Sequence, residues 1–145
     1  MSIYPIIKMG HPTLRKVASP VAPSDIDRPE MHTLIADMVE TLHDAGGIGL
    51  AAPQIDRPIQ LAIIEVPGGP SRYGEIEALP LTVFFNPVLT VVDPAEAGYW
   101  EGCLSVPGLR GFVHRPQHVR VHYMDIAGEQ ASIDLKGFLA TVVQH

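Results

Sequence analysis

The sequence contains little of what marks a secreted or membrane protein. Its single cysteine, Cys103, rules out an intramolecular disulfide, although small secreted domains usually depend on several. It has no apolar run near the roughly 20 residues that cross a bilayer, and its first residues lack the charged-then-apolar order of a signal peptide. We therefore expect a soluble cytoplasmic protein with no membrane partner.

Basic residues are also few. The 10 Lys and Arg residues are outnumbered by 16 Asp and Glu residues, which gives a formal net charge of −6. This balance argues against a broad basic surface, so we expect no direct nucleic-acid partner. A length of 145 residues and a hydrophobic fraction of 46% are enough for one buried core, which predicts a single domain over residues 1–145.

Helical signals occur near the start and the end of the chain. Four prolines before about residue 24 predict an extended N-terminal strap. From Pro29 the apolar residues fall at helical spacing, with Asp27 available as a cap and Gly46-Gly47 as the end. Residues 137–145 fit a second short helix, although pattern alone leaves a strand open.

Strand signals fill the region between these helices. Residues 59–66 and 81–92 are rich in β-branched residues, with a surface loop expected at 67–75 and a bend at Asn86-Pro87. Residues 119–124 alternate and turn at Ala127-Gly128 into 130–135, which predicts a hairpin. The predicted fold class is α+β, with mostly antiparallel β-sheets around a C-terminal helix and a long N-terminal helix.

Three short segments carry the residues suited to chemistry: GIGLAAPQ at 47–54, EGCLS at 101–105, and the final Gln144-His145. Each has an ordinary structural explanation, because free cysteine is often just buried and a histidine on a helix face is often just hydrogen-bonded. The glycine-rich segment is not a phosphate loop, since no Lys-Ser/Thr pair follows it. Together, however, Cys103 and His145 offer a thiolate and an imidazole, which suit zinc or ferrous iron.

On these segments the sequence resembles the peptide deformylase family, whose motifs occur in the order G-x-G-x-A-A-x-Q, E-G-C-L-S and Q-H-E-x-x-H. The first two motifs match fully, and the third matches as far as His145. The resemblance runs from the N-terminal strap to residue 145. It implies a deformylase-like fold around a metal-binding C-terminal helix.

The resemblance implies that Cys103 and His145 are two of three ligands to one divalent metal ion. The third ligand would be a histidine four positions beyond His145, and the catalytic glutamate would follow His145 directly. We therefore expect the domain to be incomplete at its C-terminus, and a chain that ended at His145 to be inactive. The family suggests Fe²⁺ in the cell, while Zn²⁺ or Ni²⁺ can occupy such sites in a purified sample.

The reaction that the resemblance implies is hydrolysis of the formyl group from N-formylmethionyl nascent peptides, at the ribosome exit, by a monomer. The side-chain amide of Gln54 and the backbone N–H of Leu104 would stabilise the oxyanion. Glu101 would be a structural carboxylate paired with Arg115.

Substrate contacts are also implied by the resemblance. Backbone groups of Ile48, Gly49 and Gly102 would pair with the peptide, and Arg110 would reach it at the rim. The methionine side chain would enter a pocket formed by Ile48, Phe138, Thr141 and Val142. Residue by residue, these four positions fit an ordinary core at least as well.

Two other functions remain open on the sequence. A degenerate relative could keep the peptide cleft and bind N-termini without cleaving them. A metal-free thiol hydrolase could use Cys103 activated by His145, with Gln54 as oxyanion donor, and rapid inactivation by a chelator would exclude it. The remaining histidines show no recognisable ligand spacing and are not assigned.

Overall fold

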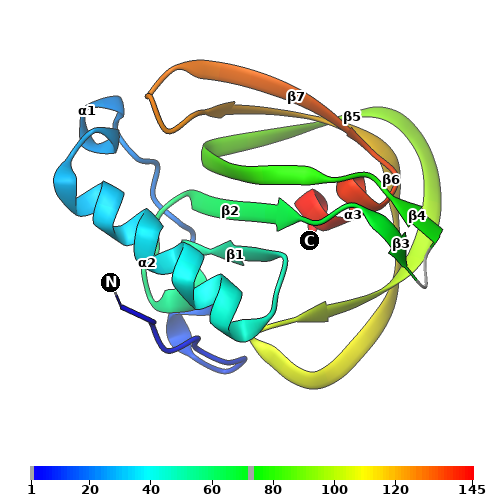
Figure 1. Ribbon diagram of the computed structural model, residues 1–145, viewed down its shortest axis with the longest axis horizontal. Coiled ribbons are helices and arrows are strands. Elements are labelled where there is room, and N and C mark those ends of the chain that lie inside the picture. The colour runs from blue at the N-terminus through cyan, green and yellow to red at the C-terminus, as the bar shows by residue number, and fades with distance from the viewer. Residues whose placement is uncertain (1, 72–73) are drawn as a thin grey trace.

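The computed structural model describes residues 2–71 and 74–145 and contains two sheets and three α-helices within those ranges. The larger sheet has five antiparallel strands in the order β1-β2-β5-β6-β7, and the smaller pairs β3 with β4 (Figure 1). The mostly antiparallel α+β prediction is therefore confirmed. The helical elements are η1 (Pro12–Arg15), α1 (Pro23–Ile26), α2 (Pro29–Ala45), η2 (Ala52–Ile55) and α3 (Phe138–Gln144), and the strands are β1 (Gly49–Ala51), β2 (Leu61–Val66), β3 (Gly69–Ser71), β4 (Gly74–Ile76), β5 (Leu79–Cys103), β6 (Val106–Met124) and β7 (Gln130–Lys136).

The longest helix, α2, begins at Pro29 and ends at Ala45, where the sequence placed it. The predicted cap was wrong, because Arg28 occupies the N-cap position and no side chain caps the helix. Pro29 accounts for the start without a cap, since a proline in the first turn fixes φ and has no N–H to satisfy. At the other end Gly46 adopts φ 67°, the left-handed conformation that favours glycine.

The N-terminal segment is extended over much of its length, but it is interrupted by η1 and α1. The expectation of a wholly extended strap was therefore too simple. Pro12 and Pro23 stand at the first positions of these two short helices, where a missing N–H costs nothing. Prolines that exclude long helices can thus begin short ones.

The central strands follow the sequence pattern closely. β6 and β7 form the predicted hairpin, with Val121 opposite Ile133. The predicted bend at Asn86-Pro87 is a bulge in β5, where the register against β6 shifts between Phe85 and Val88. Asn86 adopts φ 51°, and its amide pairs with both backbone groups of Val21, which fastens the N-terminal segment to the sheet.

The segment at 67–75 differs from the predicted loop, because it includes β3 and the start of β4. Gly69 pairs with Ile76 and Ser71 with Gly74, so this is a small separate hairpin. Part of the predicted loop, residues 72 and 73, lies outside the described residues. Glycine and proline content predicted a loop here and did not indicate the short strands β3 and β4.

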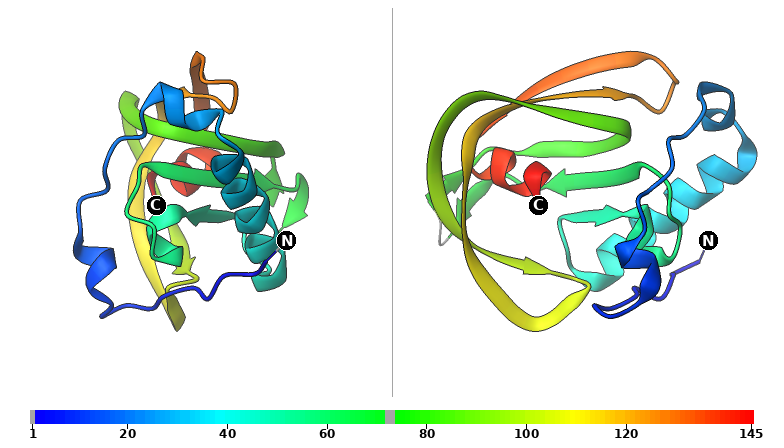
Figure 2. Two further views of the ribbon diagram at one scale, coloured as in Figure 1. Left: turned by 90° about the vertical axis from the view of Figure 1, so that its left-hand side faces the viewer. Right: turned by 180° about the vertical axis from the view of Figure 1, so that it is seen from behind.

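Two cores form on opposite faces of the large sheet. On β5, Val83 and Phe85 pack in the cluster that includes α2, whereas Phe84 packs in the cluster that includes Leu139 of α3. This alternation is the two-residue period of a strand buried on both faces. The last residues therefore form a helix on the sheet, and the long curved strands β5 and β6 wrap around it (Figures 1 and 2).

Candidate active site

Cys103 is the last residue of β5, immediately before the tight connection to β6. It pairs with Val106 after a register shift that follows Gly102, and its side chain is half-buried. Leu104 and Ser105 form the connection itself. The thiol is therefore held at a sharp reversal of the chain, where the carbonyls of Leu104 and Ser105 accept hydrogen bonds from the N-terminal segment.

Gln54, in η2, faces this reversal. Its side-chain carbonyl accepts a hydrogen bond from the backbone N–H of Ala51 at 2.9 Å, which orients the amide. The amide nitrogen Nε2 donates to Oγ of Ser105 at 3.1 Å and lies 3.8 Å from Sγ of Cys103. The first and second sequence motifs thus meet in space through Gln54.

Ser105 is a contributor that the sequence reading did not single out as a site residue. It is only 4% exposed, and its hydroxyl accepts from Gln54. Its position inside the EGCLS motif was the available signal. A buried hydroxyl next to a proposed ligand fixes the direction of the neighbouring amide.

His145 is held by the buried carboxylate of Glu101, which lies in the same strand as Cys103. Its Nδ1 lies 2.7 Å from Oε1 of Glu101, and Glu101 accepts two hydrogen bonds from the guanidinium of Arg115, at 2.6 and 2.9 Å. The pairing of Glu101 with Arg115 that the resemblance implied is thus present. The side chain of Glu101 is 8% exposed, whereas that of Arg115 is 25% exposed.

The charges in this network favour an ionised carboxylate. Hydrogen bonding from Arg115 lowers the pKa of Glu101, burial opposes that effect, and the bond with His145 lowers the pKa further. The same partnership raises the pKa of Arg115. A paired, hydrogen-bonded arrangement of this kind tolerates burial that a lone charge would not.

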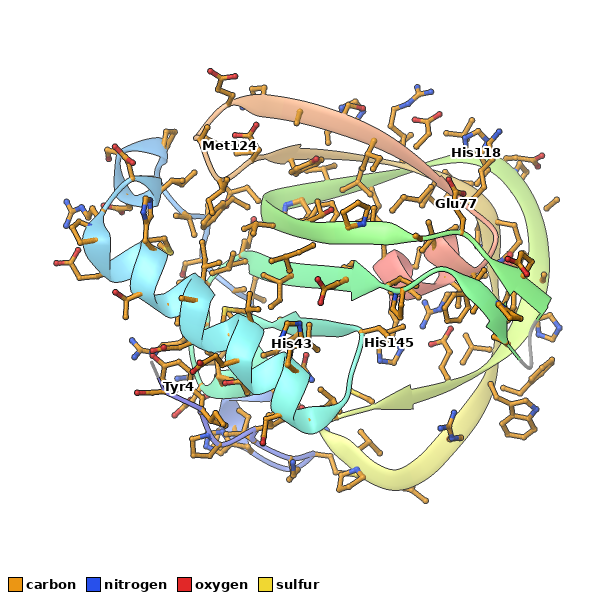
Figure 3. The ribbon with its side chains drawn as sticks, viewed as in Figure 1. Tyr4, His43, Glu77, His118, Met124 and His145 are labelled. Atoms are coloured by element: carbon orange, nitrogen blue, oxygen red, sulfur yellow. The ribbon has the colours of Figure 1, made fainter. Side chains whose placement is uncertain are left out.

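A pocket of about 420 Å³ joins these elements. It brings together four residues predicted for the site, Gly102, Cys103, Arg110 and His145, although they come from β5, β6 and the end of α3. The complete lining is Glu101, Gly102, Cys103, Val106, Leu109, Arg110, Gly111, Val113, Arg115 and His145. Figure 3 places His145 near the centre of the molecule, within the curve of the long strands.

The predicted methionine pocket lies elsewhere in the packing. Ile48, Phe138 and Val142 are half-buried against the core cluster shared with α3, and none of them lines the 420 Å³ pocket. Thr141 is 3% exposed, and its hydroxyl accepts from the side-chain amide of Gln117 at 3.1 Å. These contacts agree with the core reading that the sequence left open for these residues.

The second glycine of the first motif, Gly49, lies at an edge of the sheet. Gly49 of β1 pairs with Ile64 of β2, and β1 is an edge strand of the five-stranded sheet that the described residues form. Nearby, a side chain at Gly47 would come within 2.9 Å of Cδ1 of Leu104. Glycine at 47 therefore lets the first motif approach the Cys103–Ser105 connection closely.

The donor set fits part of a catalytic metal site. Cys103 and His145 offer a thiol and an imidazole to one pocket, and Glu101 holds Nδ1 of the imidazole. Across residues 2–71 and 74–145, however, no group of three His, Cys, Asp or Glu side chains is arranged to hold a metal ion. The described residues thus offer two candidate ligands where about three are usual.

These features define a class of protein: an α+β domain in which a thiol and an imidazole line one pocket and an oriented amide contacts the thiol, as in hydrolases that act on an amide carbonyl. The family model described as "Polypeptide deformylase" matches residues 3–145. The chain belongs to the polypeptide deformylase family.

Individual relatives agree with the family match. The chain is 46% identical to peptide deformylase 2 of Pseudomonas syringae pv. tomato, over 97% of this chain and 78% of that protein. It is 38% identical to the peptide deformylase of Leptospira biflexa, over 100% of this chain and 81% of that protein. The chain thus spans about four fifths of these relatives.

Solved structures show the same fold. A class I type b peptide deformylase from Acinetobacter baumannii with bound Met-Ala-Ser matches with a TM-score of 0.92 and 32% identity, over 100% of this chain and 91% of that one. Peptide deformylase from Thermotoga maritima matches with a TM-score of 0.86 and 31% identity, over 100% and 89% of the two chains. Both agree with the antiparallel fold described above.

Family membership makes this protein a deformylase, a hydrolase of protein biosynthesis from a family of metalloenzymes. The comparisons give no support to the non-catalytic alternative. Within the part of the chain that the structure describes, no helix is long and apolar enough to cross a membrane.

Proposed function

We propose that Cys103 and His145 hold one divalent metal ion in a deformylase site, where Gln54 and the backbone N–H of Leu104 stabilise the oxyanion formed from the formyl carbonyl. The observation that carries this proposal is the convergence on Cys103: Gln54 contacts its sulfur, and His145 lines the same pocket. The family supplies the reaction class, which is hydrolysis of a linear amide.

The metal is Fe²⁺ in the cell, and Zn²⁺ or Ni²⁺ can replace it in a purified sample. When bound, a divalent metal supplies a water whose pKa is lowered enough to provide hydroxide near neutral pH. Glu101 holds Nδ1 of His145 at 2.7 Å and so leaves Nε2 as the ligand atom. Arg115 keeps Glu101 ionised, which fixes the imidazole for this role.

Gln54 and Leu104 act on the developing charge. The amide of Gln54 is already oriented toward Cys103 by the Ala51 N–H, so it loses little freedom when it donates to the oxyanion. Removal of one such donor typically lowers kcat by roughly 100-fold to 1000-fold. The N–H of Leu104 follows Cys103 directly and supplies the second donor.

The substrate is an extended N-formylmethionyl peptide. It pairs with the backbone of Ile48 and Gly49 at the free edge of β1 and with Gly102, and Arg110 holds it at the pocket rim. The methionine side chain packs beside Ile48, Phe138, Thr141 and Val142, which lie in and around α3, the helix that leads to His145. The bound Met-Ala-Ser of the Acinetobacter baumannii protein fits such a peptide.

Residues 1–145 form part of one deformylase domain, which acts as a cytoplasmic monomer on nascent peptides at the ribosome exit. The chain covers 78% and 81% of the length of the two relatives named above.

Formate release from formyl-Met-Ala-Ser by the full-length, metal-loaded protein tests the proposal. We expect release from the wild type, loss of release in Cys103→Ala and after chelation, and normal release in the control His122→Gln, which alters an exposed histidine of β6. Release that survives chelation but not Cys103→Ala would favour the thiol hydrolase. Binding of the peptide without release would contradict the deformylase assignment.

A further inference from the structure

The first residues of the chain are fastened to α2. Residues 2–11 are the first part of the N-terminal segment described above, and from here on we call these residues alone the strap. The backbone N–H of Ser2 donates to Oδ1 of Asp37 at 2.8 Å, and that of Tyr4 donates to Oγ1 of Thr41 at 2.9 Å. Both acceptors are at least 96% buried. The strap then passes beneath α2 toward the connection between β5 and β6 (Figure 1).

Three consecutive strap residues reach the candidate site. The N–H of Ile7 donates to the carbonyl of Gln54 at 2.8 Å, and the N–H of Met9 donates to the carbonyl of Ser105 at 2.8 Å. Between them, Nζ of Lys8 donates to the carbonyl of Leu104 at 3.3 Å. Three neighbouring residues thus bind the backbone of both elements that carry the proposed oxyanion donors.

We propose that residues 7–9 of the strap position these donors relative to each other, with Lys8 as a positioning residue for the N–H of Leu104. The inference rests on the proposed roles of Gln54 and Leu104. Those two residues lie on η2 and on the β5–β6 connection, which are far apart in sequence. The strap is a backbone bridge between them, in addition to the side-chain bond from Gln54 to Ser105.

Lys8 acts on the peptide plane that follows Leu104. Its ammonium restrains the carbonyl of Leu104, and Met9 restrains the next carbonyl, so the chain on the C-terminal side of the Leu104 N–H cannot rotate freely. An exposed lysine contributes little to folding stability. We therefore expect the bond from Lys8 to affect the rate of the reaction, because a small misplacement of the Leu104 N–H lowers the rate strongly.

The test compares four variants of the full-length, metal-loaded protein with formyl-Met-Ala-Ser as substrate. Lys8→Met removes the bond to Leu104, Lys8→Arg keeps a cation, and Lys16→Met removes the charge of another exposed lysine in the N-terminal segment. Gln54→Ala reports whether the proposed oxyanion site operates at all. The Leu104 and Ser105 amide peaks in ¹⁵N–¹H spectra of the metal-free protein provide a readout apart from activity.

We expect Lys8→Met to lower kcat by about 10-fold with KM unchanged, which is less than the roughly 100-fold cost of losing a donor. Lys8→Arg should recover most of that loss, and Lys16→Met should match the wild type. The two amide peaks should move in Lys8→Met and stay in place in Lys16→Met.

Two results separate the proposals. If Gln54→Ala is nearly inactive while Lys8→Met retains the wild-type kcat, the positioning role is wrong and the deformylase site stands. If Gln54→Ala retains the wild-type kcat, the proposed oxyanion role itself fails. A rise in KM at unchanged kcat in Lys8→Met would also overturn the positioning role, because it would indicate substrate binding.

Discussion

The two sides of the candidate site are held by different forces. On one side, Gln54 is oriented by neutral hydrogen bonds from Ala51 and to Ser105. On the other, His145 is held by Glu101, an ionised carboxylate that also accepts two bonds from Arg115. Cys103 contacts Gln54 of the first side and lines the same pocket as Glu101 and His145 of the second.

The difference separates two tasks. Neutral donors can be redirected toward a developing charge without a large desolvation cost, so they suit a group that acts only in the transition state. A buried ion pair is costly to break, so it suits a group that must not move. We therefore expect changes on the Gln54 side to affect rate, and changes on the Glu101 side to affect stability first.

The largest expected effect is on the neutral side. Gln54→Ala should lower kcat by roughly 100-fold, because an oriented donor is lost from the transition state. The matched control is Gln60→Ala, whose amide donates to the carbonyl of Ala18 away from the site at 3.2 Å. Steady-state kinetics should show normal kcat in the control, with a loss of about 1 kcal/mol of unfolding free energy. Equal kcat in the two variants would mean that the Gln54 side of the site has no special effect on the rate.

The next effect is on the ionic side. Arg115→Met should lower the free energy of unfolding by about 2 kcal/mol, because it leaves the buried Glu101 without its main partner, although Arg115 is itself partly exposed. Arg120→Met is the matched control, since Arg120 binds Asp134 with the same two-bond geometry on the surface. Chemical denaturation should show a much smaller loss there. Similar losses would mean that burial does not set the strength of the Glu101 network.

The smallest expected effect is on how stability depends on pH through the surface pair of Arg120 and Asp134. Hydrogen bonding lowers the pKa of Asp134 from 3.8 to about 2, and the bond from Arg120 contributes more to this than the bond from His118. Since the folded pKa lies below the unfolded value, this stabilisation is present above about pH 4 and is lost as the pH falls toward 2. Denaturation at several pH values should show a shallower acid loss in Asp134→Asn than in the wild type. Parallel curves for the two proteins would contradict this.

Patterns local in sequence predicted much of the fold. The apolar spacing and Gly46 located α2, and alternation with a glycine turn located the β6–β7 hairpin. Each of these features depends on residues a few positions apart, so a linear pattern contains them. The resemblance of two motifs to the family placed Cys103 and Gln54 in one site, and the contact between their side chains agrees with that placement.

Other features depend on contacts that no local pattern contains. Residues 137–145 could have been a strand, and packing of Leu139 and Ala140 on the sheet favours the helix. The methionine pocket was ambiguous for the same reason, since Ile48, Phe138 and Val142 look alike in a core and in a binding pocket. No local pattern predicted the contact made by Lys8, because its partner Leu104 is 96 residues away.

That separation has a consequence for the order in which the protein is completed during synthesis. Lys8 and Met9 leave the ribosome early, but their partners Leu104 and Ser105 are made 96 residues later. At about 5–20 residues per second, translation alone imposes a delay of roughly 5–20 s between the two. Ser2, Tyr4 and Ile7 have their acceptors on α2 and at Gln54, which are made much earlier. The strap can therefore be fastened in two stages, and its bonds from Lys8 and Met9 wait until the β5–β6 connection has emerged.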